Sequence, residues 1–212
     1  MDFVTFTSKL RRRLSDELPG YAAQHLMEPV FRQRMMAPDT KDAMESAVLI
    51  LLYAEANDIK LILTLKQADL GVHSGQISLP GGKKDASDAS YADTALRETF
   101  EEIGVELHRM EILGKLSPLF VPPSNFIIHP YVGFTHRRPQ YVLSDNEVAR
   151  LFEVNLDGFF APENKTFFTK EFLDGKHYEV PAYKLDDYFV WGATAMILSE
   201  FEAVCGEVDY TF

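Results

Sequence analysis

The sequence predicts one domain of the α/β (α+β) class with additional helices, and three observations lead to this expectation. Short apolar runs rich in β-branched residues outnumber the helical patterns, and the two kinds are interleaved along the chain. The 212 residues contain no internal repeat and no linker-like segment. Their 46% hydrophobic content is typical of a folded chain with a substantial core.

The first 45 residues are expected to form an N-terminal helical extension, and residues 46–212 the main domain. Within residues 3–18, apolar side chains recur at spacings of three and four, which predicts a helix that ends at Pro19-Gly20. Residues 29–42 lack a clear period and are interpreted as an irregular connection.

Most of the strands are expected in pairs. Apolar runs at 46–54 and 60–66 flank a four-residue polar turn, which predicts a β-hairpin. A short run at 76–79 meets Pro80-Gly81-Gly82, where the chain is expected to turn because these residues interrupt both regular elements. Further strands are expected at 110–116, 127–135 and 167–180, the last divided by a hairpin turn at Asp174-Gly175.

Three further helices are predicted within the main domain. One spans residues 89–103 and ends before Gly104, since glycine commonly terminates a helix. A second is expected over residues 145–152 with Ser144 as its N-cap, and a third over residues 193–203.

The composition excludes several classes of partner and location. The 21 Lys and Arg residues stand against 32 Asp and Glu, a formal net charge of −11, which disfavours nucleic acid polymers and anionic membrane surfaces. The single Cys205 excludes an internal disulfide, and there is neither a secretory signal nor an apolar run of about 18 residues. The sequence therefore predicts a cytoplasmic protein without a membrane partner.

The most informative segment is the helix predicted over residues 89–103. At about 100° per residue, Glu98, Glu101 and Glu102 fall within one sector of the helix. Neighbouring carboxylates at these spacings repel by a few tenths of a kcal/mol per pair. Arg97 offers one counter-charge and is placed to brace Glu101. The opposite sector is expected to hold the apolar residues Ala89, Ala92, Leu96, Phe100 and Ile103.

This surplus of acid predicts a site for a divalent cation, with a solvated acidic helix face as the alternative. Oxygen ligands without Cys or His favour Mg²⁺ or Mn²⁺, and Mg²⁺ commonly bridges carboxylates to substrate phosphates. The backbone at Gly81-Gly82 can approach a ligand closely because it carries no Cβ. Lys66 and Lys83 are candidates for contacts with substrate phosphates, with a solvated surface position as the alternative.

The segment resembles the Nudix box, the signature of the Nudix hydrolase family. The pattern is matched by Gly82, Arg97, Glu98, Glu101, Glu102, Gly104 and Val105. Asp88 stands in place of the first Glu, with eight residues rather than seven before Arg97, and Thr99 occupies a site that is usually apolar. The longer spacing and the upstream His73-x-Gly75-Gln76-x-x-x-Pro80-Gly81-Gly82 are similar to the coenzyme A pyrophosphatase branch, in which an arginine usually stands where this chain has Lys66.

The resemblance implies an α/β/α sandwich with a mixed sheet, Mg²⁺- or Mn²⁺-dependent hydrolysis, and a possible homodimer. Its implied substrate is a nucleoside diphosphate-linked small molecule, most closely coenzyme A, which would give 3′,5′-ADP and 4′-phosphopantetheine. ADP-ribose, a dinucleoside polyphosphate, or nucleotide sensing without catalysis are the alternatives. The residues implied are Glu101, Glu98 and Arg97 in catalysis; Glu98, Glu101, Glu102 and Gly82 at the metal; and Lys66, Gly81 and Lys83 at the substrate.

One acid outside this motif is a further candidate. Glu147 is a possible distant member of the site, with a carboxylate at the start of the helix predicted over residues 145–152 as the alternative role.

Overall fold

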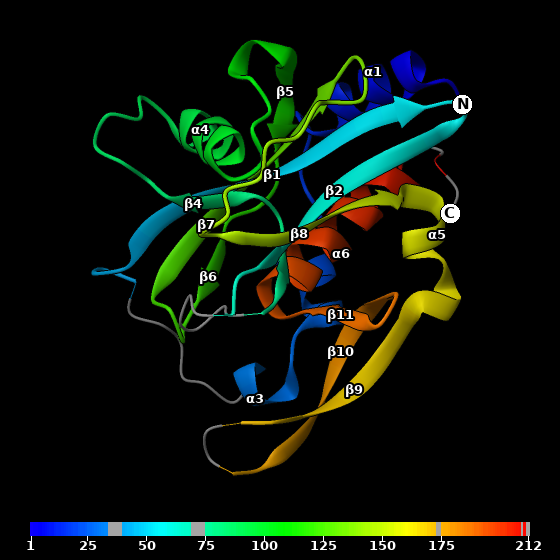
Figure 1. Cartoon of the computed structure of the whole chain (residues 1–212). Helices are drawn as coiled ribbons and strands as arrows, with labels where there is room; N and C mark the ends of the chain where they lie inside the picture. Colours follow the sequence, from blue (N-terminus) through cyan, green and yellow to red (C-terminus); the bar gives the residue numbers. More distant parts are fainter. Residues whose placement is uncertain (34–39, 69–74, 173–174, 209, 211–212) are drawn as a thin grey trace.

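The computed structural model describes residues 1–33, 40–68, 75–172, 175–208 and 210 (Figure 1). The helices of three turns or more are α1 (Phe3–Arg13), α4 (Tyr91–Ile103) and α6 (Gly192–Gly206). Shorter helices are α2 (Tyr21–Gln24), α3 (Val30–Gln33) and α5 (Leu156–Phe160), with 3-10 turns at His25–Met27, Leu107–Arg109 and Pro162–Asn164. The strands are β1 (Met44–Glu55), β2 (Asp58–Lys66), β3 (Ile77–Ser78), β4 (Gly81–Lys83), β5 (Met110–Lys115), β6 (Leu119–Val121), β7 (Phe126–Thr135), β8 (Val148–Asn155), β9 (Lys165–Glu171), β10 (His177–Leu185) and β11 (Tyr188–Trp191).

The main sheet is mixed, as the sequence resemblance implied. Its strand order is β3-β2-β1-β7-β5, with β4 paired to β1, β6 to β7 and β8 to β2. Strands β1 and β7 run parallel, with Leu49 opposite Tyr131, and the other pairs are antiparallel. The long strand β1 therefore lies at the centre and meets three partners along its length.

Successive side chains of β1 point to opposite faces of this sheet, and helices cover both faces. Leu49, Leu51 and Tyr53 face the core that α4 covers, whereas Ile50 and Leu52 face the core that α1 and α6 cover. All five of these side chains are fully buried, as expected for a central strand that is packed on both sides. The predicted α/β/α arrangement is confirmed.

The second sheet packs into the core on the α6 side. Its strand order is β11-β10-β9, and all pairs are antiparallel. Tyr183 of β10 and Val190 of β11 are fully buried in the same cluster as Phe6 and Leu10 of α1. The N-terminal helix thus shares the core of the main domain, while the boundary expected at residue 45 stays a prediction. No helix in the described ranges is long and apolar enough to cross a bilayer.

Several predicted elements are confirmed. The helix expected over residues 3–18 is present but ends at Arg13. The first hairpin joins β1 and β2 with Glu55 opposite Asp58, so its turn is two residues tighter than expected. The runs at 76–79, 110–116 and 127–135 contain β3, β5 and β7, residues 167–180 divide into β9 and β10, and the helix expected at 193–203 is α6. At the predicted turn between β9 and β10, Gly175 has a φ of 72°, and Asp174 lies outside the described residues.

Three predictions about secondary structure are wrong. The helix expected over residues 145–152 with Ser144 as its cap is instead a turn followed by β8, because Phe152 and Val154 alternate into the core and β8 pairs along β2. The chain does not simply turn at Pro80-Gly81-Gly82, since Gly81–Lys83 forms β4 against β1. The connection expected to be irregular contains α3.

A partly buried polar cluster links β8 to β1 of the sheet. The Glu153 carboxylate accepts hydrogen bonds from Tyr53 Oη at 2.5 Å, Tyr141 Oη at 2.9 Å and Arg138 Nε at 2.9 Å. These donors, led by Arg138, outweigh burial and lower the pKa of Glu153 to about 2.

We expect this cluster to make stability depend on acid pH. Because the pKa of Glu153 is lower in the folded protein than its ordinary value of 4.5, the stabilisation is complete above about pH 4.5 and is lost as the pH falls towards 2. Glu153→Gln should lower the free energy of unfolding at pH 7 by at most about 3 kcal/mol. Denaturant titrations from pH 7 to 2 should show the difference from wild type shrinking below about pH 4, and a constant difference would contradict the expectation.

Candidate functional site

The helix α4 forms at the place the sequence predicts because both of its ends are capped. Ser90 Oγ accepts a hydrogen bond from the Asp93 N–H at 3.2 Å, and Gly104 closes the helix in the left-handed conformation with φ of 75°. The helix lies against β1 and against the short strand β4, which begins at the glycine turn. Its acidic residues are therefore brought to Gly81 and Gly82.

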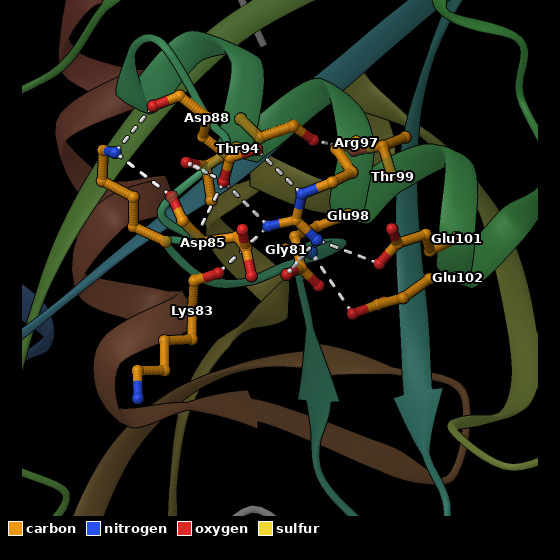
Figure 2. A network of polar contacts seen from close by, with 12 residues as sticks. Gly81, Lys83, Asp85, Asp88, Thr94, Arg97, Glu98, Thr99, Glu101 and Glu102 are labelled. Atoms are coloured by element: carbon orange, nitrogen blue, oxygen red, sulfur yellow. Dashed lines mark hydrogen bonds and ion pairs between the residues drawn. The ribbon is translucent and has the colours of Figure 1, made fainter.

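The Arg97 guanidinium is the centre of a polar network at this helix (Figure 2). It donates five hydrogen bonds: two to the Asp88 carboxylate, both at 2.9 Å, and one each to Glu98 at 2.8 Å, Glu101 at 3.0 Å and the Lys83 carbonyl at 3.1 Å. The contact with Glu101 that the sequence predicted is confirmed. These bonds direct the fork to acceptors within the protein, so Arg97 fixes other groups in position.

Glu98 lies directly over the backbone of Gly82. A Cβ at position 82 would come within 2.3 Å of Glu98 Oε2, so only glycine leaves room for the carboxylate where it stands. Burial raises the pKa of Glu98 above its ordinary value, and the hydrogen bond and positive charge of Arg97 oppose this shift. The glycine turn and the carboxylate thus form one compact unit.

Glu102 is the most deeply buried acid of the site, with 1% of its surface exposed. Its Oε1 forms an ion pair with Lys66 and accepts a 3.4 Å hydrogen bond from the Gly81 N–H (Figure 2 shows the latter). Its Oε2 is buried and has no hydrogen-bond partner among the described residues. Burial raises the pKa of Glu102, and Lys66 opposes the shift by favouring the charged carboxylate.

The expectation that acids occupy one face of α4 and apolar residues the other is wrong in part, although Ile103 is buried and Leu96 packs against the same core cluster as expected. Phe100, expected in the core, is 46% exposed. The face turned to the protein instead contains Thr94, Ala95, Thr99, Glu102 and Ile103. Thr99 fits there because its hydroxyl donates to the Ala95 carbonyl at 2.7 Å. The acidic and buried sectors therefore overlap at Glu102, which points inward.

Two of the predicted site residues lie at the edge of this arrangement. The Glu101 side chain is 50% exposed and, within the described part of the chain, joins the others only through Arg97. Lys83 is exposed, and Figure 2 shows its side chain leading away from the carboxylates while its carbonyl accepts from Arg97. The structure thus brings together Glu98, Glu102, Gly81, Gly82 and Lys66.

Asp88 has a role that the sequence prediction did not assign to it. Its side chain is 5% exposed, binds the Arg97 fork through both oxygens, and accepts hydrogen bonds from Thr94 Oγ1 and the Asp85 N–H, each at 2.9 Å. The Arg97 hydrogen bonds hold its pKa well below the ordinary range. The signal was present as an acid just before the helix, but sequence alone does not show that the chain folds back to Arg97.

Glu147 also lies near the acids, although not in the role expected of a helix start. It immediately precedes β8, where Val148 pairs with Lys66, and its carbonyl accepts a 3.0 Å hydrogen bond from the Gln67 N–H. Its negative charge raises the pKa of both Glu98 and Glu102. His73, part of the motif before the glycine turn, lies outside the described residues.

The donors at this site fit a divalent cation chemically. They are hard carboxylate oxygens, and the buried, unpartnered Oε2 of Glu102 is the kind of atom that a cation satisfies. In the described part of the chain, no three Asp, Glu, His or Cys side chains are grouped closely enough to hold an ion as they stand. Arg97 and Lys66 occupy the carboxylates instead, so an incoming cation has to compete with these two side chains.

Comparisons with known proteins agree with this geometry. A family model described as the NUDIX domain matches residues 44–175. The Nudix hydrolase NudL of Pectobacterium atrosepticum, described as uncharacterized, is 34% identical over 174 residues, covering 82% of this chain and 84% of that protein. The peroxisomal coenzyme A diphosphatase ndx-8 of Caenorhabditis elegans is also 34% identical, over 158 residues, covering 72% of this chain and 65% of that protein.

A solved structure shows the same fold at lower sequence identity. The MutT/nudix family protein from Enterococcus faecalis superposes with a TM-score of 0.55 and 19% identity, covering 100% of this chain and 77% of the other.

The two glycines of the turn should respond differently to alanine. At Gly81 the backbone has a φ of 153°, and a Cβ would meet the Ala47 carbonyl oxygen at 2.4 Å, so Gly81→Ala should cost about 3 kcal/mol or more of unfolding free energy. At Gly82 the nearest obstacle is the movable end of Glu98, so Gly82→Ala should cost less than about 1 kcal/mol. Thermal and denaturant unfolding of the two variants test this, and equal losses would count against the geometry.

Proposed function

The chain belongs to the Nudix hydrolase family, and we propose that it hydrolyses the diphosphate of coenzyme A or a coenzyme A derivative. Enzymes of this family act on diphosphate bonds of nucleoside diphosphate derivatives. The products proposed here are 3′,5′-ADP and 4′-phosphopantetheine, formed by adding one water across the diphosphate. The observation that carries the proposal is the convergence of Glu98 and Glu102 on the Gly81-Gly82 turn in a chain of this family.

The choice of coenzyme A rests on the relatives and on the segment before the Nudix box. A relative that is 34% identical is named a coenzyme A diphosphatase. The sequence from Gly75 through the glycine turn is similar to the same branch, although Lys66 replaces its usual arginine. ADP-ribose and dinucleoside polyphosphates are the competing substrates that an assay has to separate.

Nudix hydrolases generally use divalent cations, and we propose Mg²⁺ or Mn²⁺ for this one. Glu98 and Glu102, with Glu101 and the Gly82 carbonyl as further oxygen donors, would hold it. When bound, such an ion neutralises substrate phosphates and lowers the pKa of water. The unpartnered Oε2 of buried Glu102 supports this assignment over a merely solvated acidic helix.

The other side chains of the site are assigned roles in proton transfer and in positioning. We propose that a carboxylate of Glu98 or Glu101 accepts the proton of the attacking water, while the water oxygen bonds to phosphorus and the bridging P–O bond breaks. Glu147 is a further candidate for this proton transfer because its charge acts on Glu98 and Glu102. Arg97 acts as a positioning residue, since its hydrogen bonds are directed to Asp88, Glu98, Glu101 and the Lys83 carbonyl.

Substrate phosphates need positive partners beside these acids. The Gly81 N–H and the ammonium of Lys66 both reach Glu102 and are the nearest candidates, with Lys83 on the exposed side of the turn. The acidic composition disfavours nucleic acid polymers as ligands. The cytoplasmic location and the homodimer stay predictions.

The substrate assignment is tested by incubating the protein with Mg²⁺ and, separately, coenzyme A, ADP-ribose and diadenosine polyphosphates. We expect coenzyme A to be cleaved to 3′,5′-ADP and 4′-phosphopantetheine with the highest kcat/KM, as resolved by chromatography. A higher kcat/KM for ADP-ribose or a dinucleoside polyphosphate would overturn the coenzyme A assignment. Absence of turnover with all of them would overturn the enzymatic role.

The role of the buried acid is tested by Glu102→Gln, with Glu106→Gln as its matched control. The amide keeps the shape but removes the anionic ligand, so kcat should fall by about two to three orders of magnitude. Glu106 follows the helix and is 58% exposed, so its variant should keep wild-type turnover. Circular dichroism should show that both variants are folded, and a near wild-type rate for Glu102→Gln would mean that the site lies elsewhere.

A further inference from the structure

The ion pair between Lys66 and Glu102 has consequences beyond stability, and they rest on the function proposed above. Lys66 is the last residue of β2, and its backbone N–H donates to the Gln76 carbonyl at 3.0 Å. Its side chain is 14% exposed and reaches inward to Glu102, which is 1% exposed. A buried carboxylate is costly without a counter-charge, so Lys66 supplies the charge that Glu102 needs in the free protein.

The two cationic side chains of the site differ in how firmly they are held. Arg97 is fixed by five hydrogen bonds spread over four residues. The ammonium of Lys66 contacts Glu102 alone among the described residues. A lysine also has a flexible stem and a single point charge, unlike the planar fork of arginine. Of the two, Lys66 is therefore the side chain that can leave its carboxylate.

A divalent cation at the unpartnered Oε2 and the Lys66 ammonium at Oε1 would be held by the same carboxylate. Two positive groups on one buried anion repel each other strongly where water is scarce. The ammonium therefore has to move when a cation binds Glu102. Once released, the ammonium can neutralise the diphosphate of a substrate, because a cation held by Glu102 would draw substrate phosphates to the same place.

We propose that Lys66 is an exchangeable counter-cation that passes from Glu102 to the substrate diphosphate. In the free protein it neutralises Glu102, divalent cation binding releases it, and the released ammonium binds a substrate phosphate. Metal and substrate binding are then positively coupled through this one side chain, and the metal binds first. The coupling is reciprocal, so bound substrate also raises the affinity of the site for the cation.

Amine labelling of the wild-type protein tests the exchange without relying on activity. Acetylation rates of Lys66 and Lys60 are measured by peptide mass spectrometry in buffer, with Mg²⁺, and with Mg²⁺ plus imidodiphosphate, whose bridging nitrogen resists hydrolysis. Lys60 lies on the same strand, is 16% exposed, pairs with Asp58 at 3.4 Å and serves as the internal control. Mg²⁺ should accelerate labelling of Lys66 about fivefold or more, and imidodiphosphate should reverse the acceleration.

A rate for Lys66 that Mg²⁺ leaves unchanged or lowers would overturn the exchange. An acceleration shared equally by Lys60 would also overturn it, because it would reflect a general change in the protein.

The variants Lys66→Met and Lys60→Met give the second test, since each removes one positive charge from β2. Mn²⁺ affinity is followed by electron paramagnetic resonance and imidodiphosphate affinity by calorimetry at saturating Mn²⁺. Lys66→Met should bind Mn²⁺ about threefold to tenfold more tightly, because its competitor is gone, and imidodiphosphate about tenfold more weakly. Lys60→Met should match wild type in both measurements.

The two affinities distinguish the exchange from other roles of Lys66. A merely structural lysine would weaken both affinities, and either that result or unchanged Mn²⁺ affinity would overturn the proposal. If Lys66→Met does not fold, the labelling of the wild-type protein still tests whether Mg²⁺ releases Lys66. Failure of the wild type to bind Mn²⁺ at all would instead contradict the proposed metal-dependent function, so the two failures can be told apart.

Discussion

The double hydrogen bond between Arg97 and Asp88 is the interaction on which the site depends. It fixes the guanidinium with both oxygens of a nearly buried carboxylate, and the remaining N–H groups are then directed at Glu98, Glu101 and the Lys83 carbonyl. Without this anchor, Glu98 and Glu101, three positions apart on α4, would repel each other without the counter-charge that they share. Arg97 therefore holds Glu98 and Glu101 of α4 in defined positions in the ligand-free protein.

The sheet supplies the second constraint, because it sets the distance between α4 and the glycine turn. Strand β4 pairs with β1 so that Gly81 lies opposite Val48 and Gly82 opposite Ala47. Ala47 also belongs to the buried cluster that Ala95 and Ile103 of α4 enter. The same strand therefore positions the helix by packing and the turn by backbone hydrogen bonds. A small shift of either would separate Glu98 from Gly82, where there is no room for a Cβ.

Local signals were sufficient to predict α4, the first hairpin and the group of acids, because caps, periodicity and turn residues act within a few positions. These local signals failed where the structure of a segment depends on the element that packs or pairs against it. The side of α4 that faces the protein is decided by β1 and β4, which turn Glu102 inward and leave Phe100 outside. The segment 145–152 carries apolar residues that suit a helix or a strand, and the free edge of β2 selects the strand. Asp88 gains its role through a fold of the chain back to Arg97, and Lys66 gains its role through Glu102, a distant residue in the sequence.

The net charge of −11 argues against nucleic acid but not against a diphosphate, because the surplus of acid is uneven in space. Around α4, Arg97 pairs with Asp88, Glu98 and Glu101, and Lys66 pairs with Glu102, while Glu147 adds a further negative charge. That imbalance attracts a divalent cation, and a bound cation reverses the local sign for an anionic ligand. A free diphosphate would be repelled by the same carboxylates. Under the exchange proposed for Lys66, the bound cation and the released ammonium both favour its binding, which links affinity for substrate to the state of one buried glutamate.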